Sequence, residues 1–230
     1  MSSDGLGDAE LWHILKKVDL VTREVEAGKR WSMQSLEDQD ALLDASEDMH
    51  HFPFGLLLWE SAIALARYTA GHAGQVCGKT VLELGCGAGL PGMAAAEAGA
   101  QVCQSDHLPA ALALARRNAL NNSMPPIAQF LADWQQWPRR ERCQIVMGAD
   151  LIYDRTLHHD LWRVLQRSVL PGGEVWLTDP QRLTLPEFLA LKPGAWQLET
   201  VLLPTQSLPD AVSESRIVEV KLMRFIVPLS

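Results

Sequence analysis

The sequence lacks most of the features that mark secreted or metal-binding proteins. Among 230 residues there are only four cysteines, and no two of them form a Cys-x-x-Cys pair. With no histidine cluster beside them, this spacing indicates neither a disulfide framework nor a zinc site. We therefore expect four buried thiols in a reducing cytoplasm, at Cys77, Cys86, Cys103 and Cys143.

Long apolar segments and excess positive charge are also missing. The longest near-continuous apolar run, Phe52 to Trp59, is far shorter than the ~20 residues that a helix needs to cross a bilayer. The first residues, MSSDGLGDAELWHILKK, hold no apolar core of a signal peptide, so we expect none there. The 20 Lys and Arg against 28 Asp and Glu give a net charge of −8. This balance argues against a nucleic-acid partner, which normally needs a basic face, but not against a cationic substrate.

The composition is that of an ordinary globular protein, with 47 % apolar and 21 % charged residues. The length suits one domain with an N-terminal segment. We assign residues 1–50 to an N-terminal extension and residues 51–230 to the domain. The extension is expected to contain a short helix at 9–18, a β-hairpin from Val21 to Ser35, and an acidic loop at 37–51.

From about residue 79, short apolar runs alternate with longer helical patterns. This alternation predicts an α/β fold with a mainly parallel sheet. Strands are expected at Thr80–Leu84, Gln101–Ser105, Ile127–Phe130, Gln144–Gly148 and Glu174–Thr178. Helices are expected at Ser61–Thr69, Pro91–Ala98, Pro109–Asn121, Leu157–Leu170 and Leu183–Leu191. The β-rich runs Trp196–Leu203 and Ile217–Val227 have no helix between them, which predicts an antiparallel pair at one sheet edge.

The most informative segment is VLELGCGAGLPG at 81–92, where an apolar strand runs into a glycine-rich loop and a helix. Glycines allow a tight turn and a close approach of a ligand to the backbone. Gly87, Gly89 and Gly92 fit the dinucleotide pattern G-x-G-x-x-G, whereas Gly85, Gly87 and Gly89 fit G-x-G-x-G behind an acid, Glu83. A buried carboxylate would repel a pyrophosphate but suits an ammonium group. The second pattern is favoured, and NAD binding or a turn without ligand remain alternatives.

This loop resembles the S-adenosylmethionine loop of class I methyltransferases. The resemblance implies a Rossmann-like, seven-stranded, mostly parallel sheet with helices on both faces, and places Glu83 beside the ammonium of the cofactor. Asp106, at the end of the second strand, would accept the ribose hydroxyls, and Asp133 with Trp134 would hold the adenine. The alternatives are a helix N-cap at Asp106 and a solvated loop acid at Asp133.

Asp150-Leu151-Ile152-Tyr153, an Asp-x-x-Tyr after the fourth strand, is similar to the motif of family 16-type methyltransferases. That branch contains many protein-lysine methyltransferases, and the segment GLLLWE at 55–60 and Asp179-Pro180 resemble it as well. The resemblance implies that Trp59 lies near the cofactor, that Asp150 positions the incoming acceptor, and that Tyr153 bonds the amine or lines its channel. A carboxylate raises the pKa of an amine, so Asp150 is not assigned as a base. A helix cap at Asp150 and plain packing at Tyr153 are the alternatives.

These resemblances imply an S-adenosylmethionine-dependent N-methyltransferase that acts on a lysine side chain of a protein. A small amine or a nicotinamide-like heterocycle is the alternative acceptor. An NAD-binding oxidoreductase and a non-catalytic binding module are less favoured, because the glycine loop and its carboxylates are all present. No metal, membrane or nucleic-acid partner is expected, and the pairs His50-His51 and His158-His159 are expected on the surface.

Overall fold

The computed structural model of the protein describes residues 19–37, 54–208 and 216–229. The helix expected at 9–18, most of the acidic loop and the pair His50-His51 lie outside the described residues.

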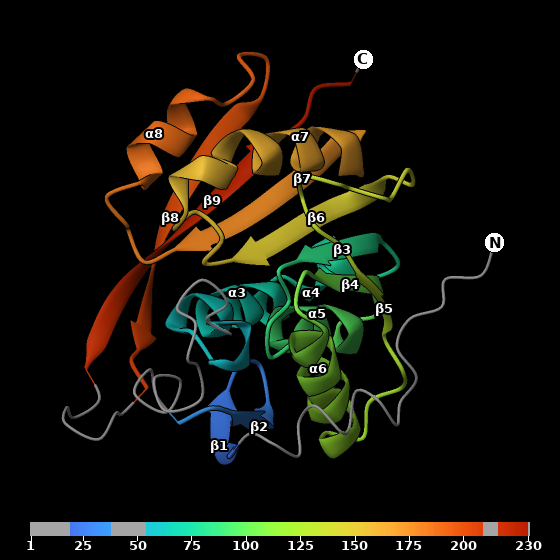
Figure 1. Cartoon of the computed structure of the whole chain (residues 1–230), viewed down its shortest axis with the longest axis vertical. Helices are drawn as coiled ribbons and strands as arrows, with labels where there is room; N and C mark the ends of the chain where they lie inside the picture. Colours follow the sequence, from blue (N-terminus) through green and yellow to red (C-terminus); the bar gives the residue numbers. More distant parts are fainter. Residues whose placement is uncertain (1–18, 38–53, 209–215, 230) are drawn as a thin grey trace.

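A seven-stranded sheet with the order β5-β4-β3-β6-β7-β9-β8 forms the centre of the molecule (Figure 1). The first five strands in this order are parallel, and β9 pairs antiparallel with both β7 and β8. The predicted fold class is confirmed, with the antiparallel pair at one edge. In chain order the strands are β3 (Thr80–Leu84), β4 (Gln101–Asp106), β5 (Ala128–Leu131), β6 (Cys143–Ala149), β7 (Val169–Asp179), β8 (Gln197–Gln206) and β9 (Ile217–Ile226).

One strand begins earlier than its sequence suggests. The helix expected at Leu157–Leu170 ends at Ser168, and β7 starts at Val169 rather than at Glu174. The segment LPGG at 170–173 is therefore part of the strand, at a point where the pairing of β7 with β6 shifts register. Gly172 has a left-handed φ of 72° there, so the strand is irregular at this point, and Gly173 O accepts a hydrogen bond from Val227 N of the C-terminal segment at 3.0 Å.

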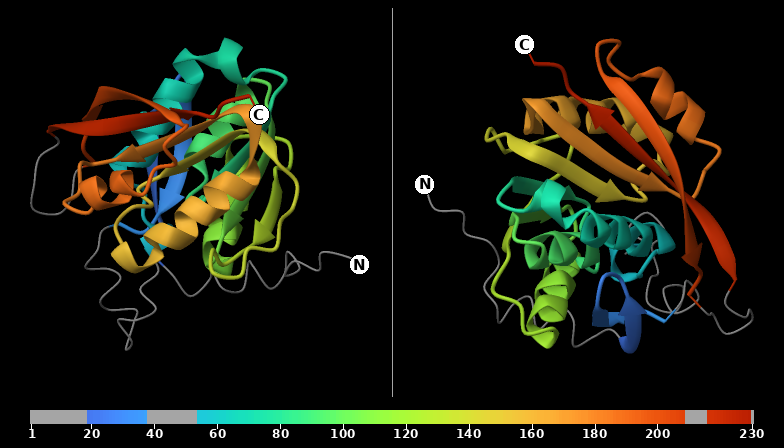
Figure 2. Two further views of the ribbon diagram at one scale, coloured as in Figure 1. Left: turned by 90° about the horizontal axis from the view of Figure 1, so that it is seen from above. Right: turned by 180° about the vertical axis from the view of Figure 1, so that it is seen from behind.

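Helices cover both faces of the sheet, because alternate residues of a strand point to opposite sides (Figure 2). Val81 packs in a cluster with residues of α3 and α5, whereas its neighbour Leu82 packs with α7 and α8. The helices are α3 (Glu60–Gly71), α4 (Ala73–Val76), α5 (Leu90–Glu97), α6 (Pro109–Asn121), α7 (His158–Ser168) and α8 (Leu185–Ala190), with single turns η2 (Phe54–Leu56) and η3 (Arg155–Leu157).

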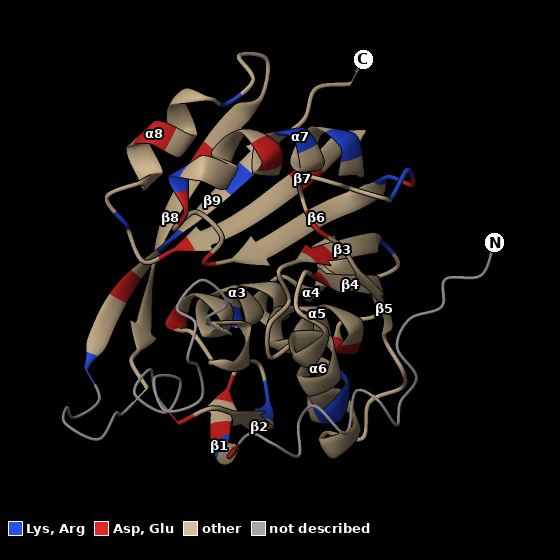
Figure 3. Ribbon diagram, in the orientation of Figure 1, with Lys and Arg blue, Asp and Glu red and all other residues tan. Residues whose placement is uncertain are grey.

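Helix α7 shows why these segments pack as they do. It buries Leu161, Trp162 and Leu165 against the sheet and carries Arg163 and Arg167 on its other side (Figure 3). Apolar residues at helical spacing form one stripe, which the strands below cover.

Within the described residues, no helix combines the length and the apolar character that crossing a membrane requires.

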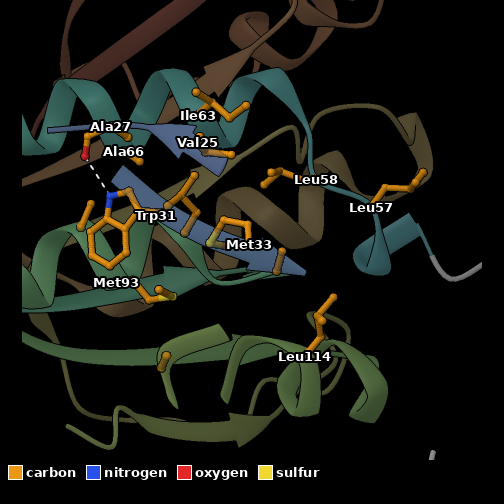
Figure 4. Close-up of a cluster of buried hydrophobic side chains, with 14 of the residues drawn as sticks. Val25, Ala27, Trp31, Met33, Leu57, Leu58, Ile63, Ala66, Met93 and Leu114 are labelled. Carbon is orange, nitrogen blue, oxygen red and sulfur yellow. Dashed lines mark hydrogen bonds between the residues drawn. The ribbon is translucent and has the colours of Figure 1, made fainter. Parts of the chain in front are cut away.

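The predicted N-terminal hairpin is confirmed, with β1 (Val21–Glu26) and β2 (Arg30–Ser35). Its inward side chains Val25, Trp31 and Met33 share one buried cluster with Ile63 of α3 and Leu114 of α6 (Figure 4). The indole N–H of Trp31 donates to Ala27 O at 2.9 Å, which satisfies its polar atom inside this cluster. The hairpin thus packs on α3, α5 and α6, the helices on one face of the sheet.

Asn118 of α6 and Asn122, the residue after this helix, form hydrogen bonds with the backbone of β2. Asn118 accepts from Gln34 N at 2.8 Å and donates to Gln34 O at 3.0 Å, and Asn122 forms the same pair with Ser32 at 2.9 Å each. These side-chain amides satisfy backbone groups as a neighbouring strand would. Asn118 also donates to Ala88 O in the glycine loop at 3.0 Å, so the hairpin is tied to that loop.

Two expectations about buried and exposed residues are wrong. His158 is buried, with its ring against Phe188 and its Nε2 3.0 Å from Ile152 O, because it opens α7 on the side that faces the sheet. All four cysteines are free thiols, but only Cys86 and Cys143 are buried. Cys77 is exposed because it follows the short helix α4 at the surface.

Candidate active site

The glycine loop between β3 and α5 has a backbone that requires glycine. Gly85, Gly87 and Gly89 have φ values of 55°, 50° and 86°, in the left-handed region that L side chains rarely adopt. A Cβ on Gly87 would also lie 3.1 Å from the carbonyl oxygen of Gly55 in η2. The segment before α3 therefore lies directly against the loop.

Glu83, at the end of β3, lies under this loop and is almost completely buried. Its Oε2 accepts a hydrogen bond of 2.7 Å from Gln104, which also donates to Gly89 O at 3.1 Å. Burial raises the pKa of Glu83 to about 8, although the hydrogen bonds from Gln104 and Gly92 oppose this shift. Near neutral pH the carboxyl is thus mainly protonated until a cation lies beside it.

Asp106, the last residue of β4, is only 5 % exposed and fixes the loop from the neighbouring strand. Gly87 N donates to its Oδ2 at 3.0 Å, and Leu108 N donates to its Oδ1 at 2.9 Å. Burial raises the pKa of Asp106, and these two N–H groups lower it in part. Leu108, not Asp106, is the N-cap of α6, so the alternative role of Asp106 as a helix cap is wrong, and its bond to Leu108 N is a local turn before the helix. A carboxylate with about four acceptor positions still has room for hydroxyl donors.

Asp133 and Trp134 follow β5, the edge strand that neighbours β4 and its last residue, Asp106. Asp133 is exposed, and its Oδ1 accepts from Gln135 N at 2.8 Å. Both residues line a cavity of about 400 Å³ together with His107 and Leu108. This volume lies within the range of about 300–1,000 Å³ that is typical of ligand pockets.

A second, smaller cavity of about 80 Å³ lies over the glycine loop, and Gly85, Trp134 and Tyr153 line both cavities. The ten site residues predicted from the sequence all line one or both of them: Trp59, Glu83, Gly85, Gly87, Gly89, Asp106, Asp133, Trp134, Asp150 and Tyr153. The structure thus brings them together, and their roles toward a ligand remain predictions.

Three aromatic side chains line the smaller cavity, and two of them, Phe54 and Tyr153, also line the larger one. Phe54 is the middle one, with ring centroids 6.4 Å from Trp59 and 6.2 Å from Tyr153. Phe54 is 40 % exposed and Tyr153 44 %, so the opening reaches solvent. Partial burial raises the pKa of Tyr153, which keeps its hydroxyl protonated.

Asp150 lines the same cavity, but its carboxylate is already paired. Arg182, after β7, donates from Nε to Oδ1 at 2.7 Å and from Nη2 to Oδ2 at 2.9 Å. Asp150 is 7 % exposed, and it does not cap the following turn, where Asp154 accepts from Thr156 N instead. The expected role of Asp150 in positioning the acceptor stays a prediction, and an acceptor would meet a carboxylate that is already paired with a guanidinium.

The sheet order explains how these groups meet. In an open α/β sheet a ligand lies beyond the carboxyl ends of the parallel strands. Asp106 and Asp133 follow β4 and β5 on one side of β3, whereas Asp150 and Asp179 follow β6 and β7 on the other. Inside the described residues, His, Cys, Asp and Glu side chains do not gather in groups of three or more that could hold a metal ion.

Three residues of the site were not singled out from the sequence. Gln104 bonds Glu83, Asn118 bonds the loop carbonyl of Ala88, and Arg182 pairs with Asp150. Gln104 and Asn118 are polar residues inside apolar patterns, and this signal could have marked them. Nothing local marks Arg182, because its partner comes from another element.

Comparisons with known proteins agree with this geometry. Residues 37–184 match the sequence profile of the lysine methyltransferase family. The histone-arginine methyltransferase METTL23 of Homo sapiens is 36 % identical over 69 % of this chain and 87 % of that protein. The electron transfer flavoprotein beta subunit lysine methyltransferase of Danio rerio is 30 % identical over 56 % of this chain and 51 % of that protein. The chain spans between 49 % and 67 % of the rat, frog and mouse METTL23 proteins.

The fold likeness extends to solved structures. The N-methyltransferase NodS from Bradyrhizobium japonicum WM9, in complex with S-adenosyl-L-homocysteine, matches with a TM-score of 0.52 and 18 % identity. That match covers 71 % of this chain and 88 % of NodS. Fold and site together define a methyltransferase of the S-adenosylmethionine-dependent class. The chain belongs to the lysine methyltransferase family.

The residues present fit this cofactor. The left-handed glycine loop lines the smaller cavity with backbone, which a ligand can approach closely, and Glu83 is a buried carboxyl suited to the ammonium group. Asp106 and Asp133 lie at successive strand ends, where hydroxyl and amino donors of a nucleoside would meet them. Trp134 lies between the two cavities, so its ring would contact the base.

Proposed function

We propose that this protein transfers a methyl group from S-adenosylmethionine to the side-chain nitrogen of a lysine in another protein. The observation that supports this most directly is the opening walled by Phe54, Trp59 and Tyr153 beside the cofactor cradle. When bound, the cofactor supplies an electrophilic methyl group on a sulfonium. The task of this chain is to hold the nitrogen of the acceptor lysine in line with that methyl group.

Aromatic walls suit a lysine acceptor. A lysine side chain is a thin apolar stem with a cationic end, and aromatic faces attract cations and methylated ammonium groups. Since Phe54 and Tyr153 are both partly exposed, a side chain presented on a protein surface can reach between them. Tyr153 then lies where its hydroxyl can bond the amine, next to Asp150.

Arginine is the second candidate acceptor, because the human relative at 36 % identity is named a histone-arginine methyltransferase. A guanidinium keeps its charge at all accessible pH values and needs carboxylates to hold it. Here the charge of Asp150 is already balanced by Arg182, so it offers no free negative charge to a second guanidinium. A deprotonated lysine amine needs no such partner, so the described site favours lysine.

The same proposal places the reaction in the cytoplasm, with a protein acceptor and without a nucleic-acid or membrane partner. All four cysteines are free thiols, which suits a reducing compartment. The net charge of −8 would repel a nucleic acid and attract a basic protein segment.

The direct test is to incubate the protein with radiolabelled S-adenosylmethionine and a lysate of its source cell. Label should appear in a protein band, and acid hydrolysis should release methylated lysine. Methylated arginine would move the assignment to the second candidate, and label in small molecules or nucleic acid would overturn the proposal. Asp106→Ala serves as the control, because a variant with weakened cofactor binding should label the same band more slowly.

A further inference from the structure

Asp150, which lines the smaller cavity, forms an ion pair with Arg182. Both hydrogen bonds run between the same two groups in a bidentate arrangement, 2.7 and 2.9 Å long. The carboxylate is almost buried, and the Arg182 side chain is 34 % exposed. Bidentate pairs of this kind are among the strongest charge-assisted hydrogen bonds.

The surroundings of Arg182 direct its charge toward Asp150. Its backbone N–H donates to Asp179 Oδ1 at 2.7 Å, which fixes the turn after β7. Asp179 Oδ2 is buried without a hydrogen-bond partner among the described residues, and burial raises the pKa of this carboxyl. Asp179 is thus a second carboxyl near Arg182, but its hydrogen bond goes to the backbone of Arg182 and not to the guanidinium. The hydrogen bond to Asp150 raises the pKa of Arg182, so its charge is permanent.

The aromatic groups beside the pair add no charge to it. The guanidinium lies 6.0 Å from the ring centroid of Trp59, and the hydroxyl of Tyr153 is neutral. Tyr153 is in turn influenced by Asp106 and Asp154. On the acceptor side of the loop, the pair is thus electrically close to neutral.

This neutrality matters for the chemistry. A lysine amine has an ordinary pKa of roughly 10.4 and attacks only after losing its proton. A free carboxylate beside it would hold the cation and raise its pKa, which opposes the reaction. A carboxylate cancelled by a guanidinium would not, while its oxygens stay in place as hydrogen-bond acceptors.

We propose that Arg182 is a specificity-determining residue of the acceptor site: it neutralises Asp150, so that the site takes the neutral amine rather than the ammonium ion. This inference rests on the proposed lysine acceptor. It assigns Arg182 a positioning role, through Asp150, and not a contact with the transferred methyl group.

The test uses n-butylamine, a mimic of the lysine side chain, with the full chain saturated with S-adenosylhomocysteine. Binding is followed by ligand-observed NMR at about pH 7 and about pH 9.5, since roughly a thousandth and a tenth of an amine of this kind are neutral there. The wild type should bind at least about tenfold more tightly at the higher pH. Arg182→Gln frees the carboxylate, so it should bind the ammonium ion at about pH 7 at least about tenfold more tightly than the wild type.

Two further variants separate charge from structure. Asp150→Asn combined with Arg182→Gln removes both charges and should restore the pH dependence of the wild type. Arg155→Gln is the matched control, because it breaks the exposed pair of Arg155 with Glu187, which also links the segment after β6 to that after β7. Its amine binding should equal that of the wild type.

The proposal fails if Arg182→Gln binds n-butylamine like the wild type at both pH values, or if the double variant binds the ammonium ion at about pH 7 as tightly as the single variant does. It also fails if the wild type binds the amine at neither pH. The lysate experiment tests the proposed function separately. Methylarginine in the lysate would contradict a lysine acceptor, but it would not change the measured preference of the site for a neutral amine.

Discussion

The backbone N–H of Gly87 donates a hydrogen bond to Oδ2 of Asp106 over 3.0 Å, although 19 positions separate the two residues. This bond joins the middle of the glycine loop to the end of β4. A single carboxylate therefore shapes the cradle and stands at its edge, where a ribose would lie. Changes at Asp106 should act on the cofactor through both effects.

Asp106→Ala should weaken the binding of S-adenosylmethionine and of its demethylated product by about 1–3 kcal/mol, which is roughly 5- to 150-fold. Loss of the Asp106 carboxylate leaves Gly87 N and the ribose hydroxyls without a charged hydrogen-bond acceptor. Titration calorimetry measures both ligands. Asp106→Asn should lose less, because its amide oxygen still accepts. Unchanged affinity in folded Asp106→Ala would remove Asp106 from the cofactor site.

Cofactor affinity should rise with pH between about pH 6 and 7.5, through Glu83. Its pKa of about 8 means that the free protein holds the carboxyl protonated in this range. A cation beside it favours the ionised form, so binding releases a proton and strengthens by up to about tenfold per pH unit.

Calorimetry near pH 7 in buffers of different ionisation enthalpy measures the proton released from Glu83. Glu83→Gln should bind at least about tenfold more weakly and release no such proton. Equal heats in all buffers for the wild type would contradict a protonated Glu83 that ionises on binding.

Gly87→Ala should cost stability and cofactor affinity together. Its φ of 50° and the 3.1 Å approach of a Cβ to Gly55 O force both the loop and η2 to move. We expect about 1–2 kcal/mol of strain, visible as a lower Tm. Gly71→Ala in α3 is the matched control, because a Cβ there meets nothing within 4 Å. Equal Tm and affinity for both variants would show that the loop tolerates side chains.

Asn118→Ala and Asn122→Ala should differ in their effect on the cofactor. Each amide satisfies backbone groups of β2, but only Asn118 also bonds Ala88 O in the glycine loop. Both variants should lower the free energy of unfolding, by about 1–3 kcal/mol for the groups left unpaired. Asn118→Ala alone should weaken cofactor binding several-fold. Equal loss of cofactor affinity in both variants would mean that the hairpin, not the bond to Ala88, supports the loop.

Much of the fold was predictable because its signals are local. The strand Thr80–Leu84 and the helix Pro109–Asn121 have the bounds expected from the sequence, since apolar runs, prolines and glycines mark them directly. The start of β7 was missed because Gly172 and Gly173 read as a turn, whereas pairing with Val227 keeps them in the strand. His158 was misplaced because its burial depends on how α7 packs on the sheet.

The sequence by itself determined the site's chemical groups. The chain shows three alternating glycines with an acid before them, and a carboxylate at each of several successive strand ends. Since the carboxyl ends of parallel strands meet at one edge of the sheet, these groups were expected to lie together. Only the tertiary structure decided their state. Burial shifts the pKa of Glu83, and Arg182 reaches Asp150 across 32 positions because β6 and β7 are neighbours in the sheet. Charge and solvation depend on what lies nearby in space, and no local pattern of residues encodes that.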